Sequence, residues 1–148
     1  MKINLTYDAD GYIRTPPFAL LRKSKLLIIT QFVVDTGCPY TLLNHEVMTR
    51  ARISPKSLTK VEGQVAIGGN ALQLTELDEE ISFKMTANKA GKDEQIELPI
   101  KKLLVGMPRK ESTHPTPCLL GLDFVVQNKL KFVFDSNTSN AYFERQDN

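Results

Sequence analysis

Short runs of alternating apolar and polar residues dominate the chain. Residues 2–7 read Lys-Ile-Asn-Leu-Thr-Tyr, an alternation that is typical of a half-buried strand. The same kind of run, separated by turn-forming residues, predicts further strands at residues 12–14, 26–34, 61–74 (two strands around a glycine-rich tip), 81–85, 96–105, 130–134 and 141–144. Many short strands with closely spaced turns predict a mainly β fold of the closed-barrel type.

Two short helices interrupt this pattern. Asn44 is a suitable N-cap for a helix that continues to about Arg52, and Pro55 prevents further continuation. Residues 122–127 can form a second short helix or a turn. The first strand and the turn after it predict an N-terminal hairpin within residues 1–25.

Length and composition exclude several classes. The 148 residues fit one domain, residues 1–148, and the formal charge of +2 gives no reason to expect nucleic acid or an anionic membrane as a partner. The N-terminus has no apolar signal region and no apolar run is long enough to span a bilayer, so a cytoplasmic protein is expected. Two cysteines, Cys38 and Cys118, provide neither a disulfide framework nor metal-ligand spacing.

The most informative residues are two short motifs that each occur once. Residues 32–37 read Phe-Val-Val-Asp-Thr-Gly, an apolar strand that ends in an acid, a hydroxyl and a glycine, and residues 119–121 read Leu-Leu-Gly. A carboxylate exposed at a strand end is a candidate acid–base group, because two such carboxylates close together share one proton and activate water. The chain carries this acid once, so the second carboxylate has to come from another copy. Asp-Thr-Gly is also a good turn sequence, and a structural turn remains the alternative.

These motifs resemble the retropepsin-like aspartic peptidases, the retroviral proteases and their single-domain relatives, over about residues 26–145. The resemblance implies an acid-protease barrel that works as a homodimer with the cleft on the two-fold axis. It implies that Asp35 is the catalytic acid, that Thr36 bonds its symmetry mate, and that Gly37 and Cys38 support the catalytic loop. The final strands are expected to help form the dimer interface.

The same resemblance implies a flap, which is the hairpin that closes over a substrate, and a loop that lines the substrate pocket. The flap and substrate-binding residues are expected to be Val65, Ile67, Gly68, Gly69, Thr116, Pro117 and Leu119. Behind the site, structural roles are expected for Leu120, Gly121 and Asp123. Gly68-Gly69 can also be read as an ordinary hairpin turn.

Two departures from the family pattern leave alternatives open. Cys38 replaces the usual Ser, Thr or Ala, and Pro39-Tyr40 stands where retroviral members have acidic residues that bind the substrate backbone. The leading interpretation is an aspartic endopeptidase that hydrolyses extended peptides as a homodimer, without metal or cofactor. The alternatives are a catalytically silent peptide-binding module of the same fold and, less favoured, an oligonucleotide-binding barrel. Whether Cys38 and Cys118 approach each other is left open.

Overall fold

The computed structural model describes residues 1–67, 70–108 and 116–146, and for residues 62–67 and 70 it describes the backbone alone. Most of this part of the chain is strand, and the prediction of a mainly β fold with one or two short helices is confirmed. The described strands are β1 (Lys2–Tyr7), β2 (Ile13–Arg14), β3 (Phe18–Arg22), β4 (Lys25–Thr30), β5 (Val33–Val34), β6 (Leu42–Asn44), β7 (Leu58–Ile67), β8 (Asn70–Leu77), β9 (Ile81–Lys89), β10 (Lys92–Ile100), β11 (Leu104–Pro108), β12 (Leu119–Leu120), β13 (Lys131–Asp135) and β14 (Asn140–Glu144). The helices are α1 (His45–Arg50), α2 (Leu122–Gln127) and a 3-10 helix at Pro55–Ser57. Among the described residues, neither α-helix has the length and apolar character that crossing a membrane requires.

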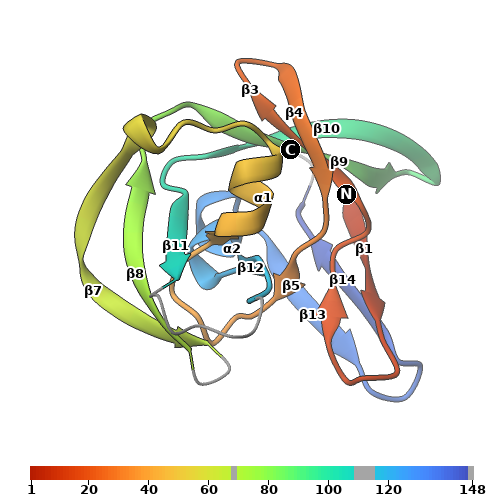
Figure 1. Cartoon of the computed structure of the whole chain (residues 1–148). Helices are drawn as coiled ribbons and strands as arrows, with labels where there is room; N and C mark the ends of the chain where they lie inside the picture. Colours follow the sequence, from red (N-terminus) through yellow and green to blue (C-terminus); the bar gives the residue numbers. More distant parts are fainter. Residues whose placement is uncertain (68–69, 109–115, 147–148) are drawn as a thin grey trace.

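The described strands join in the hydrogen-bonded order β4-β3-β9-β1-β2-β5-β12-β6-β11-β8-β7, with β10 beside β9 and β14 between β1 and β13. Strand β1 connects the two halves of this arrangement, because residues 2–5 pair with β14 whereas Thr6 and Tyr7 pair with β2. Figure 1 shows the two halves, with β7 and β8 along one side of the molecule and β1, β13 and β14 along the other.

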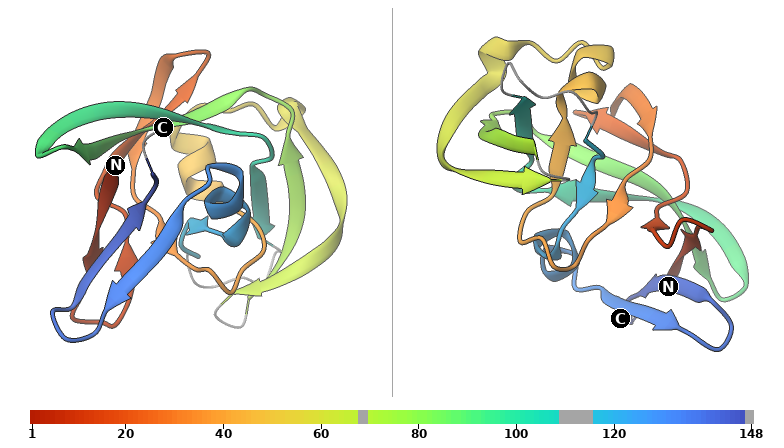
Figure 2. Two further views of the ribbon diagram at one scale, coloured as in Figure 1. Left: turned by 180° about the vertical axis from the view of Figure 1, so that it is seen from behind. Right: turned by 60° about the horizontal axis from the view of Figure 1, so that its bottom comes forward.

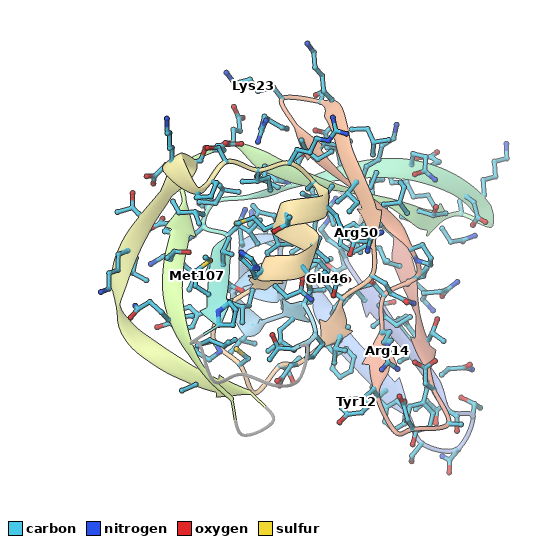
Figure 3. All side chains as sticks on the ribbon, viewed as in Figure 1. Tyr12, Arg14, Lys23, Glu46, Arg50 and Met107 are labelled. Atoms are coloured by element: carbon cyan, nitrogen blue, oxygen red, sulfur yellow. The ribbon has the colours of Figure 1, made fainter. Side chains whose placement is uncertain are left out.

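The N-terminal hairpin forms as predicted, with Tyr7 opposite Ile13. Its turn is held by Arg14, which forms ion pairs with Asp8 and Asp10 and lies 5.3 Å from the ring centroid of Tyr12 (Figure 3). The hairpin is nevertheless part of the main body of the protein. Its first strand places Ile3, which is 1% exposed, in the principal hydrophobic core.

The prediction of one continuous strand over residues 26–34 is wrong. Strand β4 pairs with β3, whereas β5 leaves that sheet and pairs with β12. The break lies at Phe32, whose N–H donates to the Thr15 hydroxyl at 3.0 Å and whose carbonyl accepts from the Thr15 N–H at 2.9 Å. The buried Thr15 therefore guides the chain from one sheet to the other. Strand β3 follows directly after Pro17 and was not predicted.

The prediction of one strand over residues 96–105 is also wrong, because β10 ends at Ile100 and β11 begins at Leu104. Strands β9 and β10 are joined by a tighter turn than expected. Ala90 and Gly91 both adopt positive φ angles, 48° and 80°, which suits a two-residue hairpin connection. Strand β11 ends at Pro108, three residues beyond the predicted end of that strand at residue 105.

Aromatic rings form the centre of the principal core. The ring of Phe83 lies 4.7 Å from Phe18, 5.3 Å from Phe32 and 5.7 Å from Phe124, measured between centroids. Complete burial of each such side chain contributes about 1.5–3 kcal/mol. Phe124 comes from α2, so this helix is anchored in the principal core. A second, smaller cluster of buried residues comprises Cys38, Leu42, Leu72, Leu74, Leu104 and Leu119.

Candidate functional site

Asp35 stands at the end of a very short strand that is held on both sides. Strand β5 is parallel to β12, with Val33 opposite Leu119 and Val34 opposite Leu120, and β2 pairs with its other edge. The N–H of Asp35 donates to the Leu120 carbonyl at 3.0 Å, which continues the parallel ladder by one residue. The backbone of the acid is therefore fixed just where the chain leaves the sheet.

The carboxylate of Asp35 is bound by its own turn. The N–H of Gly37 donates to Oδ1 of Asp35 at 3.1 Å, and the N–H of Cys38 donates to the Asp35 carbonyl, also at 3.1 Å. A Cβ atom on Gly37 would lie 3.3 Å from Oδ1, so the glycine allows this close approach. Asp35 is partly exposed, and Thr36 and Gly37 are exposed beside it. The acid is thus ordered by backbone donors and still open to solvent.

Strand β12 is inserted between the two strands that flank the Asp35 loop. It is parallel to β5 and antiparallel to β6, so the loop of residues 35–41 crosses over its end. Gly121 lies at this crossing, where a Cβ atom would be 2.2 Å from the Tyr40 carbonyl oxygen. The N–H of Leu122 donates to the Cys38 carbonyl at 2.8 Å. A side chain at position 121 would force the loop away from β12.

A buried hydroxyl ties the same loop to α2. The hydroxyl of Thr41, which is 0% exposed, donates to Oδ1 of Asp123 at 2.7 Å and accepts from the N–H of Gly121 at 3.2 Å. The same Asp123 oxygen accepts from the N–H of Phe124 at 2.8 Å. Asp123 therefore acts within the scaffold of the site. Thr41 did not stand out in the sequence, because its partner is far away along the chain.

The two cysteine side chains form hydrogen bonds with different partners. Cys38 donates through Sγ to the Tyr40 carbonyl at 3.3 Å, and the Cys118 sulfur accepts from the N–H of Asn44 at 3.3 Å. Both are free thiols, and they pack in different buried clusters. Burial, followed by the nearby charges of Asp35 and Asp123, raises the pKa of Cys38. Burial raises the pKa of Cys118 to about 12. Both thiols are therefore poor nucleophiles at neutral pH.

The expected pocket residues lie in different environments. Leu119 is 5% exposed and packs inside the smaller buried cluster, which leaves it little surface for a ligand. The Thr116 carbonyl accepts from the side-chain amide of Asn44 at 2.7 Å, whereas Pro117 is exposed. Asn44 also caps α1, since its Oδ1 accepts from the N–H of Val47 at 2.8 Å. Asn44 was predicted as a cap, but its second bond was not foreseen.

The predicted glycine-rich hairpin corresponds to β7 and β8. The backbones pair with Val65 opposite Leu72 and Ile67 opposite Asn70. The side chains of Val65 and Ile67, and the tip residues Gly68 and Gly69, lie outside the described residues. Strand β8 pairs with β11, and β11 pairs with β6, so this hairpin belongs to the same sheet as the strand that carries Asp35. Within the described part of the chain, no group of three or more His, Cys, Asp or Glu side chains could hold a metal ion.

Comparison with solved structures identifies the fold. A retropepsin-like aspartic protease from Rickettsia conorii is similar over 97% of this chain and 89% of its own, with a TM-score of 0.56 and 17% sequence identity. The chain has a retropepsin-like fold. This is the fold that the Asp-Thr-Gly and Leu-Leu-Gly motifs predicted.

Two further solved structures are similar to this retropepsin-like chain at lower TM-scores. The EIAV protease complexed with the inhibitor HBY-793 covers 87% of this chain and 99% of its own at 16% identity, with a TM-score of 0.47. The retroviral protease-like domain of Ddi1 from Leishmania major covers 87% of this chain and 94% of its own at 14% identity, with a TM-score of 0.38. No protein-family model and no curated protein matches the chain.

Proposed function

We propose that this protein is an aspartic endopeptidase that acts as a homodimer. The observation that carries the proposal is that Asp35 is both ordered and open to solvent. Its backbone N–H donates to the Leu120 carbonyl, and its partly exposed carboxylate accepts from the N–H of Gly37 at 3.1 Å. Asp123, the other carboxylate tied to this loop, already accepts two hydrogen bonds within the scaffold. One free acid per chain makes half a dyad, and a second copy completes it.

The proposed chemistry needs only the two Asp35 carboxylates and water. Two carboxylates a few ångströms apart cannot both ionise, so they share one proton. The ionised carboxylate removes a proton from water as it attacks the peptide carbonyl, and the protonated one polarises that carbonyl and then donates to the leaving amine. In this proposal the hydroxyl of Thr36, which is exposed in one chain, bonds the partner subunit, and neither metal nor cofactor takes part.

The proposed substrate is an extended peptide that lies beneath the β7–β8 hairpin. Such a segment binds through strand-like hydrogen bonds, and side-chain pockets give the specificity. The proposed flap residues are Val65, Ile67, Gly68 and Gly69. Thr116 and Pro117 belong to the proposed pocket loop, and Leu119, which follows them, packs in the smaller buried cluster. In this proposal the hairpin has to open for entry and close for hydrolysis.

The decisive experiment compares cleavage of a fluorogenic peptide library by the wild type, Asp35→Asn and the surface variant Asp93→Asn. Asparagine keeps an oxygen for the Gly37 N–H, so Asp35→Asn is expected to fold and lose all cleavage. Asp93→Asn is expected to cleave like the wild type. The assays run from about pH 3 to about pH 8, where a carboxyl dyad titrates, and over a dilution series. Cleavage that persists in Asp35→Asn would contradict the proposal.

A catalytically silent peptide-binding module is the second candidate. It is favoured by the Cys38 thiol, which donates to the Tyr40 carbonyl at 3.3 Å and so gives the Asp35 carboxylate no side-chain donor. In this case a wild-type dimer binds peptides from the library without cutting them at any pH. Asp35→Asn then binds them equally well.

A further inference from the structure

A broad groove lies at the end of α2, whereas the start of this helix contacts the Asp35 loop. The groove has a volume of about 1350 Å³, and its walls come from the ends of β9, β10 and β14, the end of α2 and the start of β13. In the left view of Figure 2, α2 and β13 lie in front, with β10 above them. Among the described residues that line the groove, none belongs to the Asp35 loop or to β12.

Specific hydrogen bonds hold the walls of this groove together. The side chain of Gln127, at the end of α2, donates to the Pro99 carbonyl at 2.5 Å and accepts from the N–H of Lys101 at 3.0 Å. Across the groove, Nη1 of Arg145 donates to the Asn128 carbonyl at 3.4 Å. The segments that follow β10 and β14 are therefore both tied to the end of α2, and the groove is a built part of the fold.

The size and lining of the groove favour a chain segment over a small ligand. Small-molecule pockets usually have volumes of about 300–1,000 Å³, and this groove is larger. Leu98 and Leu130, which are 2% and 9% exposed, form buried apolar parts of its lining. Lys129 and Lys131 are exposed beside them. An extended segment can contact both the apolar and the charged parts of such a surface.

Cations outnumber acids in the groove. The charged residues that line it are Lys89, Lys129, Lys131, Arg145, Glu97 and Glu144. Lys89 forms an ion pair with Glu94 at 3.4 Å. In the part of the chain that the structure describes, Lys129, Lys131 and Arg145 form no ion pair with a carboxylate. Three cations that converge on one groove are therefore available to an anionic ligand.

The guanidinium of Arg145 is the most constrained of these cations. The residue is half-buried, with Nη1 bonded to the Asn128 carbonyl and Nη2 placed 3.7 Å from Sδ of Met1. Among the described contacts, neither Glu97 nor Glu144 forms an ion pair with it. A guanidinium has five N–H donors in a planar fork that matches a carboxylate, so donors remain for a ligand.

We propose that this groove is a docking site for an extended acidic segment of a partner protein. Arg145 binds one carboxylate of the segment, and Lys129 and Lys131 attract its neighbours. A nucleic-acid strand fits less well, because none of the described lining residues is an aromatic on which a base can stack. The inference does not rest on the proposed peptidase activity, since the groove and the candidate site share no described residue.

The test uses a fluorescein-labelled peptide in which glutamate alternates with threonine. Its binding is measured by fluorescence anisotropy to the Asp35→Asn protein, so that cleavage cannot consume the probe. A peptide of equal length with glutamine in place of glutamate is expected to bind at least about tenfold more weakly. Arg145→Gln is expected to weaken binding of the acidic peptide by about tenfold, because a charged hydrogen bond is lost.

A second variant guards against a folding effect. Arg145→Gln also removes the bond to Asn128, so its thermal unfolding is measured. The double variant Lys129→Gln/Lys131→Gln loses no described side-chain hydrogen bond, and it is expected to bind the acidic peptide several-fold more weakly, with a shallower dependence on salt. Arg50→Gln and Lys60→Gln remove exposed cations outside the groove and are expected to bind like the parent protein.

Several outcomes would overturn the docking site. They are equal binding of the two peptides, normal binding by the double lysine variant, and a labelled oligothymidine that binds more tightly than the acidic peptide through the same residues. Cleavage of the fluorogenic library by the wild type is scored separately. Groove-dependent binding without cleavage supports the docking site and contradicts the peptidase, whereas Asp35-dependent cleavage without groove-dependent binding supports the peptidase and contradicts the docking site.

Discussion

The hydroxyl of Thr41 donates a 2.7 Å hydrogen bond to Oδ1 of Asp123, although 82 positions separate the two residues in the chain. The same buried oxygen of Thr41 accepts from the N–H of Gly121. One side chain thus connects the end of the Asp35 loop to the first turn of α2. The loop that begins at Asp35 is therefore held at its far end by a buried side chain from within the loop.

Replacement of Thr41 by valine is expected to lower the free energy of unfolding by about 1–3 kcal/mol. Valine has nearly the same shape as threonine, but without the hydroxyl the Gly121 N–H and the Asp123 carboxylate lose a buried hydrogen-bond partner. Urea denaturation measures the change. Thr49→Val is the matched control, since Thr49 is exposed and its hydroxyl bonds the His45 carbonyl of its own helix. An equal loss in both variants would show that the Thr41 bonds add nothing specific.

Gly121→Ala is expected to be among the most damaging single-methyl additions in this protein. The new Cβ would lie 2.2 Å from the Tyr40 carbonyl oxygen, and backbone has to move to relieve the overlap. Gly106→Ala is the comparison, because its nearest neighbour at 2.8 Å is Cδ1 of Leu72, the end of a flexible side chain. Thermal unfolding is expected to show a loss of about 1–3 kcal/mol or more for Gly121→Ala and clearly less for Gly106→Ala. A larger loss for Gly106→Ala than for Gly121→Ala would contradict the tight backbone contact between Gly121 and the Tyr40 carbonyl.

Asn44 is expected to contribute through two separable hydrogen bonds. Asn44→Ala removes both the cap of α1 and the bond to the Thr116 carbonyl, so a loss of about 1–2 kcal/mol is expected. Asn44→Ser retains a capping oxygen, so it is expected to regain the stability that the cap of α1 provides but not that of the bond to Thr116. Ser54→Ala, which removes an exposed cap from the 3-10 helix, is the control. If the serine variant is as stable as the wild type, the bond to Thr116 has no measurable role.

Cys118 is expected to make the protein less stable in alkali. The thiol ionises at its ordinary value of 9.0 in the unfolded chain, whereas burial raises its pKa to about 12 in the folded protein. Below pH 9 both states hold the proton, and above it the unfolded state releases the proton first. Between pH 9 and the folded-state pKa of about 12, the free energy of unfolding therefore falls by about 1.4 kcal/mol for each pH unit.

Urea unfolding at intervals from about pH 8 to about pH 11 measures this fall. Cys118→Ala is expected to flatten it, whatever stability the variant has at neutral pH. Cys38→Ala is the comparison, with a smaller effect, because Cys38 is 9% exposed and Cys118 is 2% exposed. A pH dependence that is identical in the wild type and Cys118→Ala would rule out this thiol as its source.

The sequence predicts those features of the site whose causes are local. The Asp-Thr-Gly turn, the cap at Asn44 and the short helix over residues 122–127 all follow from neighbouring residues, and the structure contains each of them. The family resemblance could be recognised for the same reason. The requirement for glycine at position 121 was implied by the motif, but its cause, the Tyr40 carbonyl, lies in another segment.

Features that depend on distant partners could not be predicted from one sequence. Residues 26–34 are uniformly β-forming, and only the contact between Thr15 and Phe32 divides them between two sheets. Thr41 looked like an ordinary loop residue because its bonds reach the start of α2. The Asn44 bond to Thr116 was missed for the same reason. Leu119 was expected in a pocket from the family resemblance, and its apolar side chain alone does not reveal that it packs in the smaller buried cluster.

The parallel pairing of β5 with β12 also determines when the site can form during synthesis. The N–H of Asp35 is held by the carbonyl of Leu120, so most of the chain has to leave the ribosome before the acid has its anchor. Until then the Asp-Thr-Gly segment is an unsupported turn, because parallel strands distant in sequence pair late. A nascent chain therefore has no ordered Asp35 carboxylate until the segment that contains Leu120 has left the ribosome and paired with β5.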